Sequence, residues 1–287
     1  MSRFDSARLA ALMRDLLARL LRRPEDLLRF DDVRERLRLK HVVDRGTQEV
    51  PIDRIVGTIG REREFSRAFL PREESLRERW EEISELAEGQ RGFPPVELYL
   101  VGEAYFVVDG HHRVSVARVN AAPSIEARVK EFLTPVPLPA DATVQDVVLR
   151  EGQADFLETT GLVADRVDDY RTTQGNGYER LLDHISVHRY FRGIELGRDV
   201  TWEEAVASWR DTVYGPVVET IRTSEIMADF PDDTETDLYL FTMDHLYYLK
   251  QRYGEQAGQA ADAVEGIREE RKPRRGTRKR RARDRGK

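Results

Sequence analysis

Apolar residues recur at helical spacing through the first part of the chain. The segment MSRFDSARLAALMRDLLARLLRR predicts an amphipathic helix over residues 5–22, and Pro24 suits the first turn of a second helix over 24–39. We expect the leucine face of the first helix to cover the protein's own core, although its arginines would also permit contact with a membrane or a partner. The leucines of this face are Leu9, Leu12, Leu16, Leu17, Leu20 and Leu21.

Strand-like patterns follow these two helices. Gly102 and Glu103 separate two apolar runs, and a glycine at the first central position suits a type II′ hairpin turn. Asp44-Arg45-Gly46 predicts another turn, between two short strands. The strands are predicted at 41–43, 49–55, 96–101, 104–108 and 124–132.

Two further helices belong to the same region. One covers residues 73–88 and ends before Gly89, which suits a C-cap, and the other begins after Gly110 and reaches about Val119. Strands and helices in this order predict an α+β domain over residues 41–133. The face of the first helix that we expect to be buried comprises Leu76, Trp80, Ile83 and Ala87.

A different pattern begins at residues 134–140, where three prolines predict a linker. Beyond them the chain is mostly helical. Thr201 and Glu204 form a capping-box pattern, and Thr234 with Asp237 predicts the start of a last helix. The predicted organisation is N-terminal helices over 1–40, the α+β domain, the linker, a mainly α-helical domain over 141–255 and a disordered basic tail over 256–287.

Composition excludes several kinds of chemistry. The chain has 287 residues and no cysteine, which excludes disulfides, thiolate catalysis and cysteine zinc sites. No apolar run approaches the roughly 20 residues of a membrane helix. The N-terminal segment is interrupted by charges and is unlike a signal peptide. We therefore expect a cytoplasmic location and no membrane partner.

The charge is divided unevenly along the chain. The net charge is −6, but residues 271–287 hold 11 Lys and Arg and one Asp, so the rest carries −16 (−6 minus +10). Such a tail can bind DNA or RNA through phosphates, or it remains solvated or lies against the acidic body. The residues predicted to contact nucleic acid are Arg274, Arg275, Arg278, Lys279, Arg280 and Arg281.

The stretch YFVVDGHHRVSVARVN (105–120) places two histidines and an arginine at the start of a predicted helix. The first amide N–H groups of a helix are unpaired and carry a partial positive charge. Gly110 lets a ligand approach the backbone, and Arg113 can hold a phosphate in bidentate fashion. The pattern therefore favours a phosphate site. The alternative is that Gly110 is only a tight turn, with His111 and His112 capping or packing.

About a third of the chain, around this stretch, resembles the ParB/sulfiredoxin superfamily. Residues 51–55 look like the family's opening strand, and Arg-Glu-Arg-Glu-Phe at 61–65 looks like its first arginine box. Asp-Gly-His-His-Arg at 109–113 stands where ParB proteins carry Gly-Glu-Arg-Arg and sulfiredoxins carry Gly-Cys-His-Arg. The helix at 73–88 and the hairpin also follow the family's order.

The resemblance implies a small mixed-sheet domain that binds a nucleoside di- or triphosphate with Mg²⁺, with CTP and ATP as the first candidates. Arg61 or Arg63 would close over phosphates held at the start of the histidine helix. The implied phosphate-binding residues are Arg61, Arg63, Asp109, Gly110, His111, His112 and Arg113.

The family includes CTP-dependent DNA clamps, a sulfinic-acid reductase that uses ATP, and kinases that act on free serine. The reductase activity is excluded here because His111 replaces its cysteine. We find no counterpart of the clamps' helix-turn-helix DNA reader after residue 133. The serine kinases use an early glutamate as base, a place that Glu62 or Glu64 would take.

The predicted helical domain has two further features. His184 and His188 are spaced like metal ligands, with Asp244 or His245 as a third, but their aromatic surroundings favour hydrogen bonds in or beside a helical core and no metal site. Aromatic side chains here could stack on bases, although helical spacing favours packing between helices or self-association. They are Tyr190, Phe191, Trp202, Trp209, Tyr214, Tyr239, Phe241, Tyr247 and Tyr248.

Three functions remain open on the sequence. We favour a nucleotide-binding, ParB-like regulatory protein that engages DNA or RNA through its tail, with or without NTP hydrolysis. The second is a small-molecule phosphotransferase resembling the free-serine kinases, with Glu62 or Glu64 as base. The third is a protein–protein adaptor with a degenerate nucleotide cradle. A homodimer is compatible with each of them.

Overall fold

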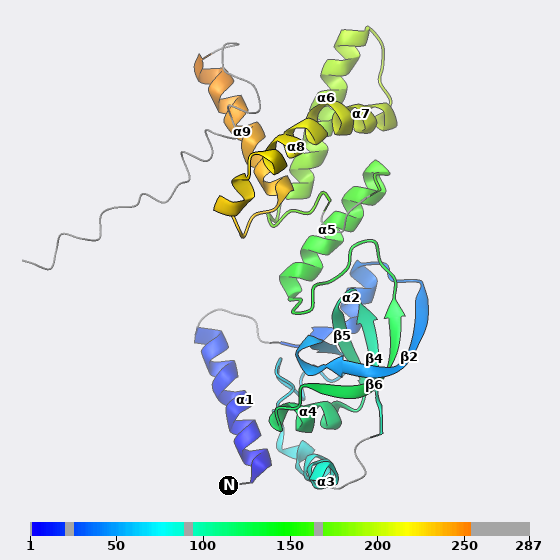
Figure 1. Cartoon of the computed structure of the whole chain (residues 1–287), viewed down its shortest axis with the longest axis vertical. Coiled ribbons are helices and arrows are strands. Elements are labelled where there is room, and N and C mark those ends of the chain that lie inside the picture. Colours follow the sequence, from blue (N-terminus) through cyan, green and yellow to red (C-terminus); the bar gives the residue numbers. More distant parts are fainter. Residues whose placement is uncertain (1, 21–25, 89–93, 164–168, 254–287) are drawn as a thin grey trace, which may run out of the picture. The chain divides into compact units, whose positions relative to one another are not determined.

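The computed structural model describes residues 2–20, 26–88, 94–163 and 169–253. It divides into two compact units, unit 1 (Met1–Ala154) and unit 2 (Asp155–Lys287), and the boundary falls within helix α5 (Val144–Thr160). Helices and strands are mixed, which confirms the predicted α+β class, and the strands of the described residues all lie in unit 1 (Figure 1).

Six strands of unit 1 form one mixed sheet in the order β1-β3-β5-β4-β6-β2. The hairpin pair β4–β5 and the pair β2–β6 are antiparallel, whereas β1–β3, β3–β5 and β4–β6 are parallel. The strands are β1 (Leu28–Arg29), β2 (Val42–Pro51), β3 (Ile55–Thr58), β4 (Val96–Val101), β5 (Ala104–Asp109) and β6 (Ser124–Phe132).

Both faces of the sheet are covered, as a mixed sheet with parallel pairs requires. On one face the apolar side chains of β4 and β5 pack with those of three helices, including Trp80. On the other face the ring of Phe30 meets Tyr99 and Phe106 at 4.8 and 5.6 Å. The helices of unit 1 before α5 are α1 (Arg3–Leu20), α2 (Phe30–Arg36), α3 (Arg77–Glu88) and α4 (His111–Val119), with 3-10 turns η1 (Ile52–Arg54) and η2 (Glu74–Leu76).

The elements with strong local signals are confirmed. The hairpin, α4 and β6 occupy the predicted residues, and Gly102 has a φ of 65° at the hairpin turn. The helix predicted over 73–88 is found as α3, which begins only at Arg77 after the 3-10 turn η2. A Cβ on Gly102 would lie 2.5 Å from the backbone nitrogen of Leu138, because the segment after β6 crosses the turn. Glu103 N donates to Leu138 O at 2.9 Å. Residues 134–140 contain no helix or strand and are fastened to the hairpin there.

Three local predictions are wrong. The helix expected over 24–39 is only α2, because Leu28 and Arg29 instead extend the sheet as β1 by pairing with Gly57 and Thr58. Residues 44–46 are not a turn between strands, since β2 continues through them with a bulge and pairs with β6 along its length. The second short strand also ends earlier, because η1 replaces its last residues.

Helix α1 buries the face opposite to the expected one. Phe4 and the alanines Ala7, Ala11 and Ala18 are buried, and the Phe4 ring meets Trp80 of α3 edge to face at 5.8 Å. The prediction that the leucine face covers the protein's own core is therefore wrong. Large apolar side chains on the outward face are 49–77% exposed, namely Leu9, Leu12, Met13, Leu16, Leu17 and Leu20, while Leu21 lies outside the described residues.

Unit 2 is helical in all of its described elements. The capping box of Thr201 and Glu204 is confirmed, and Thr234 and Asp237 begin α9 as predicted. A π-helical turn joins α7 to α8 without interruption. The elements after α5 are α6 (Gly177–Leu196), α7 (Trp202–Trp209), η3 (Arg210–Tyr214), α8 (Gly215–Thr223), η4 (Ile226–Asp229) and α9 (Glu235–Tyr253).

Candidate functional site

The junction between β5 and α4 is shaped by Gly110. This residue is the N-cap of α4 and has a φ of 94°, a left-handed conformation that favours glycine. A Cβ at this position would lie 2.5 Å from Val96 Cγ1 and 3.0 Å from Arg113 Cζ. The close contact and the backbone conformation both require glycine at this position. The first N–H groups of α4 have no intrahelical partners.

A cavity of about 300 Å³ lies at this junction. Three segments of unit 1 contribute to it: the loop after β3, helix α3, and the end of β5 with the start of α4. Figure 1 shows α3 beside α4, and the Trp80 indole N–H donates to Ser115 Oγ across these helices at 2.9 Å. The lining residues are Arg61, Arg79, Ile83, Val108, Asp109, Gly110, His111, His112 and Arg113.

His111 is held in the core beneath the cavity. It is 5% exposed, its ring stacks on Phe65 at 6.1 Å, and its Nε2 shares a hydrogen bond of 2.6 Å with Thr58 Oγ1. Burial, followed by the nearby positive charge of Arg61, lowers the pKa of His111 to about 4. The imidazole is therefore neutral at pH 7, and its fixed position gives the helix start a rigid support.

His112 is the partly exposed member of the pair. Its ring meets Phe65 edge-on at 5.6 Å, so the two histidine rings contact the same phenyl ring in different orientations. Burial and the charges of Arg61 and Arg79 lower the pKa of His112 to about 4. Its Nδ1 is buried and has no hydrogen-bond partner among the described residues. An orphaned polar atom of this kind beside a cavity is a candidate for bonding a ligand.

Arg113 is occupied by the protein itself. Its Nη1 donates to Pro94 O at 2.7 Å and Pro95 O at 2.9 Å, and its Nη2 donates to Asp109 Oδ2 at 2.5 Å. Only 14% of its side chain is exposed, whereas that of Asp109 is mostly exposed. The guanidinium therefore fastens the segment before β4 to the start of α4, and it borders the cavity while both of its Nη atoms donate to the protein.

Of the residues in segment 61–64, one lines the cavity and the other three do not. Arg61 lines the cavity and donates to Glu64 Oε2 at 3.1 Å. Glu62 Oε1 lies 3.5 Å from Arg29 Nε, and its Oε2 is buried without a partner among the described residues. Arg63 is exposed, and neither it nor either glutamate lines the cavity. Of the predicted arginine box, the structure places Arg61 at the helix start.

Sequence reasoning missed Arg79. This arginine precedes the buried Trp80 on α3 and lines the cavity while donating to Glu82 at 2.9 Å. The buried face of α3 was predictable from its spacing, and Arg79 lies at the edge of that face. Its position over α4 depends on the packing of α3 against α4, which no local pattern in the sequence specifies.

The other candidate residues are not brought to this cavity. His184 Nδ1 shares a hydrogen bond with the Tyr239 hydroxyl at 3.1 Å, and His188 Nε2 shares one with Ser208 Oγ at 2.9 Å, which confirms the packing interpretation. Trp209, Tyr214 and Tyr239 are buried together in unit 2, as predicted for interhelical packing. Other aromatic residues on the helices, including Tyr190, Phe191 and Tyr247, are exposed. The tail residues Arg274, Arg275, Arg278, Lys279, Arg280 and Arg281 lie outside the described residues.

Neither a scan against protein-family models nor a search of curated proteins finds a match for this chain. Across the part of the chain that the structure describes, no helix is long and apolar enough to cross a membrane. The same residues contain no group of three His, Asp or Glu side chains placed to hold a metal ion. The function must therefore be argued from the cavity at α4.

Proposed function

We propose that this cavity binds the phosphates of a nucleoside di- or triphosphate, and that the chain is a nucleotide-binding regulatory protein resembling the ParB/sulfiredoxin superfamily. One observation carries the proposal: Arg61, Arg79 and the first turn of α4 with its capping glycine line the same cavity. Helix N-termini and guanidinium groups both favour anions, and their combination favours phosphate.

The electrostatics of the cavity support an anionic ligand. Arg61 and Arg79 are close enough to lower the pKa of His112, so the field at the helix start is positive. Both histidines are neutral at pH 7 and can each donate one hydrogen bond without adding charge. The orphaned Nδ1 of His112 gives a ligand a specific partner.

The size of the cavity suits part of a nucleotide. Its volume of about 300 Å³ is at the lower end of the range for small-molecule sites. A phosphate chain would occupy the cavity, and the nucleoside would extend outward, with CTP and ATP as the first candidates. Mg²⁺ is usually bound by one or two carboxylates and the phosphates themselves. Asp109, exposed at the rim, would hold that ion, which would offset the negative charge of the phosphates.

Regulation is favoured over phosphoryl transfer because neither Glu62 nor Glu64, the bases that the resemblance implies, lines the cavity. A general base must reach the proton it abstracts, directly or through one water. Glu64 accepts from Arg61 and Glu62 contacts Arg29, and neither lines the cavity. Nucleotide binding would then act on a partner, and the basic tail makes DNA or RNA the first candidate. The phosphotransferase and the adaptor become outcomes of the test.

The test is calorimetric titration of the full chain with CTP, ATP, ADP and GTP, each with Mg²⁺. We expect saturable binding of one of them. Arg79→Gln should weaken it about tenfold or more, because a hydrogen bond to a charged group is removed. Arg128→Gln is the matched control, since Arg128 is an exposed arginine of β6 away from the cavity.

Equal affinities in all three proteins would show that the nucleotide binds elsewhere, the basic tail first. No binding to any of the four nucleotides would favour the adaptor. Transfer of phosphate to a small hydroxyl compound would favour the phosphotransferase.

A further inference from the structure

The outward face of α1 is a continuous apolar surface. It consists of Leu9, Leu12, Met13, Leu16, Leu17 and Leu20, which recur at intervals of three and four residues and therefore share one side of the helix. We call this set the leucine surface. Contiguous exposed apolar surface of this kind marks an interaction site in a folded protein.

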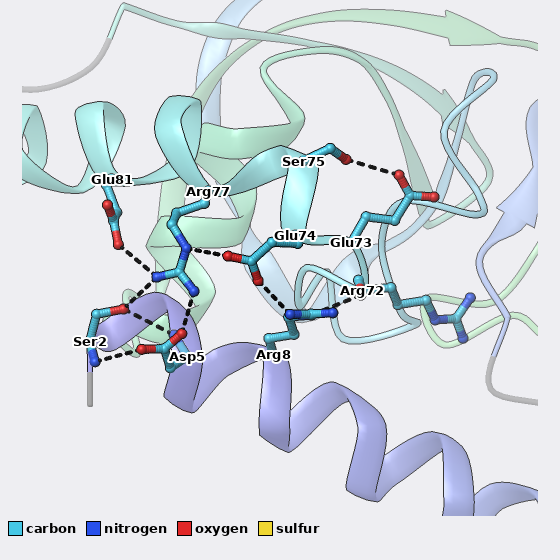
Figure 2. A network of polar contacts seen from close by, with 9 residues as sticks. All are labelled: Ser2, Asp5, Arg8, Arg72, Glu73, Glu74, Ser75, Arg77 and Glu81. Carbon is cyan, nitrogen blue, oxygen red and sulfur yellow. Dashed lines mark hydrogen bonds and ion pairs between the residues drawn. The ribbon is translucent and has the colours of Figure 1, made fainter.

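The rotation of α1 is fixed by polar contacts to α3 and the turn before it. Figure 2 shows Arg77 between Asp5 and Glu81, with Arg8 contacting Glu74 and the backbone of Arg72. The guanidinium of Arg77 also lies 4.6 Å from the centre of the Phe4 ring. These contacts hold the alanine face inward, so the exposure of the leucine surface is a specified feature of unit 1.

The same contacts separate charge across α1. Asp5 and Asp15 are the helix's two carboxylates, and both bond to arginines of the body. The hydrogen bond from Arg77 lowers the pKa of Asp5 to about 2, and Asp15 accepts from Arg72 Nη2 at 2.8 Å. Arg14 is exposed and forms no ion pair with another described residue. The free charge beside the leucine surface is therefore positive.

We infer that α1 docks in the plane of an anionic lipid surface through the leucine surface. An interfacial helix buries its apolar face at the headgroup boundary while arginines extend their side chains to the phosphates. Arg14, which is exposed on α1, can do so. The carboxylates that would be repelled by anionic lipid are already paired with the body. The acidic remainder of the chain is screened beyond a Debye length of about 8 Å.

A second copy of the chain fits the leucine surface less well. Two copies would bring identical arginines to one interface, which is unfavourable, whereas anionic headgroups complement them. One helix with six partly exposed side chains also offers less area than a stable dimer of about 1,600 Å² needs. The inferred contact needs no membrane span, and it departs from the expectation of no membrane partner.

The experiment is sedimentation of the full chain with vesicles of phosphatidylcholine containing phosphatidylserine, and with phosphatidylcholine alone. We expect binding to the anionic vesicles. The double variant Leu12→Gln/Leu16→Gln should bind at least about tenfold more weakly, since two apolar side chains no longer enter the lipid. Arg14→Gln should weaken binding several-fold. The control Leu86→Gln/Val144→Gln replaces two equally exposed apolar residues elsewhere in unit 1 and should bind as the wild type does.

All of these proteins keep the basic tail, so its attraction to lipid is common to them. The inference is overturned by absence of binding or by equal binding of the Leu12/Leu16 variant and the wild type. It is also overturned if light scattering finds a dimer that the same variant dissociates while vesicles bind neither protein. Unchanged helicity in circular dichroism would show that the variants are folded, as expected for exposed positions.

Discussion

At Gly110 the backbone conformation and the crowding around the missing side chain act together. A residue other than glycine at a φ of 94° is strained by roughly 1–3 kcal/mol. Alanine would also bring its Cβ within 2.5 Å of Val96 Cγ1, which is buried at the start of β4. The same glycine therefore fixes the backbone at the start of α4, where the proposed ligand would bind.

The cost of backbone strain and the cost of the contact with Val96 can be separated by comparing a substitution at Gly110 with one at a second glycine. Gly46 has a φ of 70° but nothing within 4 Å of a Cβ, so Gly46→Ala adds strain without a clash. We expect Gly110→Ala to lower the free energy of unfolding by about 1–2 kcal/mol more than Gly46→Ala does, since overpacking a buried contact adds to the strain. Urea titration of both variants measures this difference, and equal losses would contradict the crowded junction.

Arg113 illustrates how a residue can be found from sequence while its contacts are not. Its position at the helix start was evident, and we expected it to grip phosphate. The carbonyls of Pro94 and Pro95 occupy one of its nitrogens in the structure, because the chain returns past α4 before β4. Arg113→Ala would thus loosen the fold around the cavity, and Arg79 offers the cleaner test of binding.

At the scale of elements, the sequence predicts those that depend on neighbours along the chain. The hairpin follows from Gly102-Glu103, and the capping residues mark the starts of α7 and α9. β1 was missed because its two residues form a strand only by pairing with β3, about thirty positions later. The bulge at 44–46 was misread for a similar reason, since β6 supplies the partner that keeps β2 continuous.

The start of helix α9 is stabilised by one buried carboxylate. Asp237 is buried and accepts hydrogen bonds from the hydroxyls of Thr172, Thr173 and Thr234 and from backbone N–H groups. Burial alone would raise the pKa of Asp237, but these hydrogen bonds outweigh it and the pKa is lowered. The ionised form thus joins α9 to the segment before α6.

Replacing Asp237 should lower stability and change its dependence on pH. We expect Asp237→Asn to cost about 2 kcal/mol at pH 7, in the range for hydrogen bonds to a charged group. Because the folded pKa is lowered, the carboxylate's contribution is full above the ordinary pKa of 3.8 and is lost as the pH falls through the lower folded value. Thermal unfolding at several pH values measures this, with the exposed Asp232→Asn as the control. If the Asp237→Asn variant lost stability toward acid pH in the same way as the wild type, the role given to the Asp237 carboxylate would be contradicted.

The candidate site depends partly on local sequence, which is predictable, and partly on packing between distant segments, which is not. The sequence predicts that Arg61 and residues 109–113 meet an anion, because a strand, a glycine and a helix start form a local unit. The structure brings these residues to one cavity. Arg79 was not predictable, and neither was the exclusion of Glu62 and Glu64, because both depend on how α3 and the loop after β3 pack on α4.

At the scale of the whole molecule, the division of charge separates the two proposed sites for nucleotide and nucleic-acid phosphates. The proposed cavity site would bind through a fixed arrangement of arginines and helix amides, whereas residues 271–287 carry +10 with one acidic residue among them. A basic segment binds nucleic acid through counterion release, which falls steeply with salt, while a specific cavity depends less on ionic strength. Salt dependence therefore distinguishes the two contributions in the intact protein.

The last prediction concerns the tail and its link to the cavity. We expect the full chain to bind duplex DNA or RNA with an affinity that falls steeply as salt increases, and to change that affinity when the preferred nucleotide with Mg²⁺ is present. Replacing six basic tail residues with glutamine should reduce the slope of log K against log salt by up to about 0.9 for each phosphate that the tail no longer neutralises. The six residues are Arg274, Arg275, Arg278, Lys279, Arg280 and Arg281. Fluorescence anisotropy at several salt concentrations measures it, with Arg128→Gln as the control. An unchanged slope would contradict the role of the tail. A reduced slope with no effect of nucleotide would leave the tail as a nucleic-acid contact and contradict the proposed regulation.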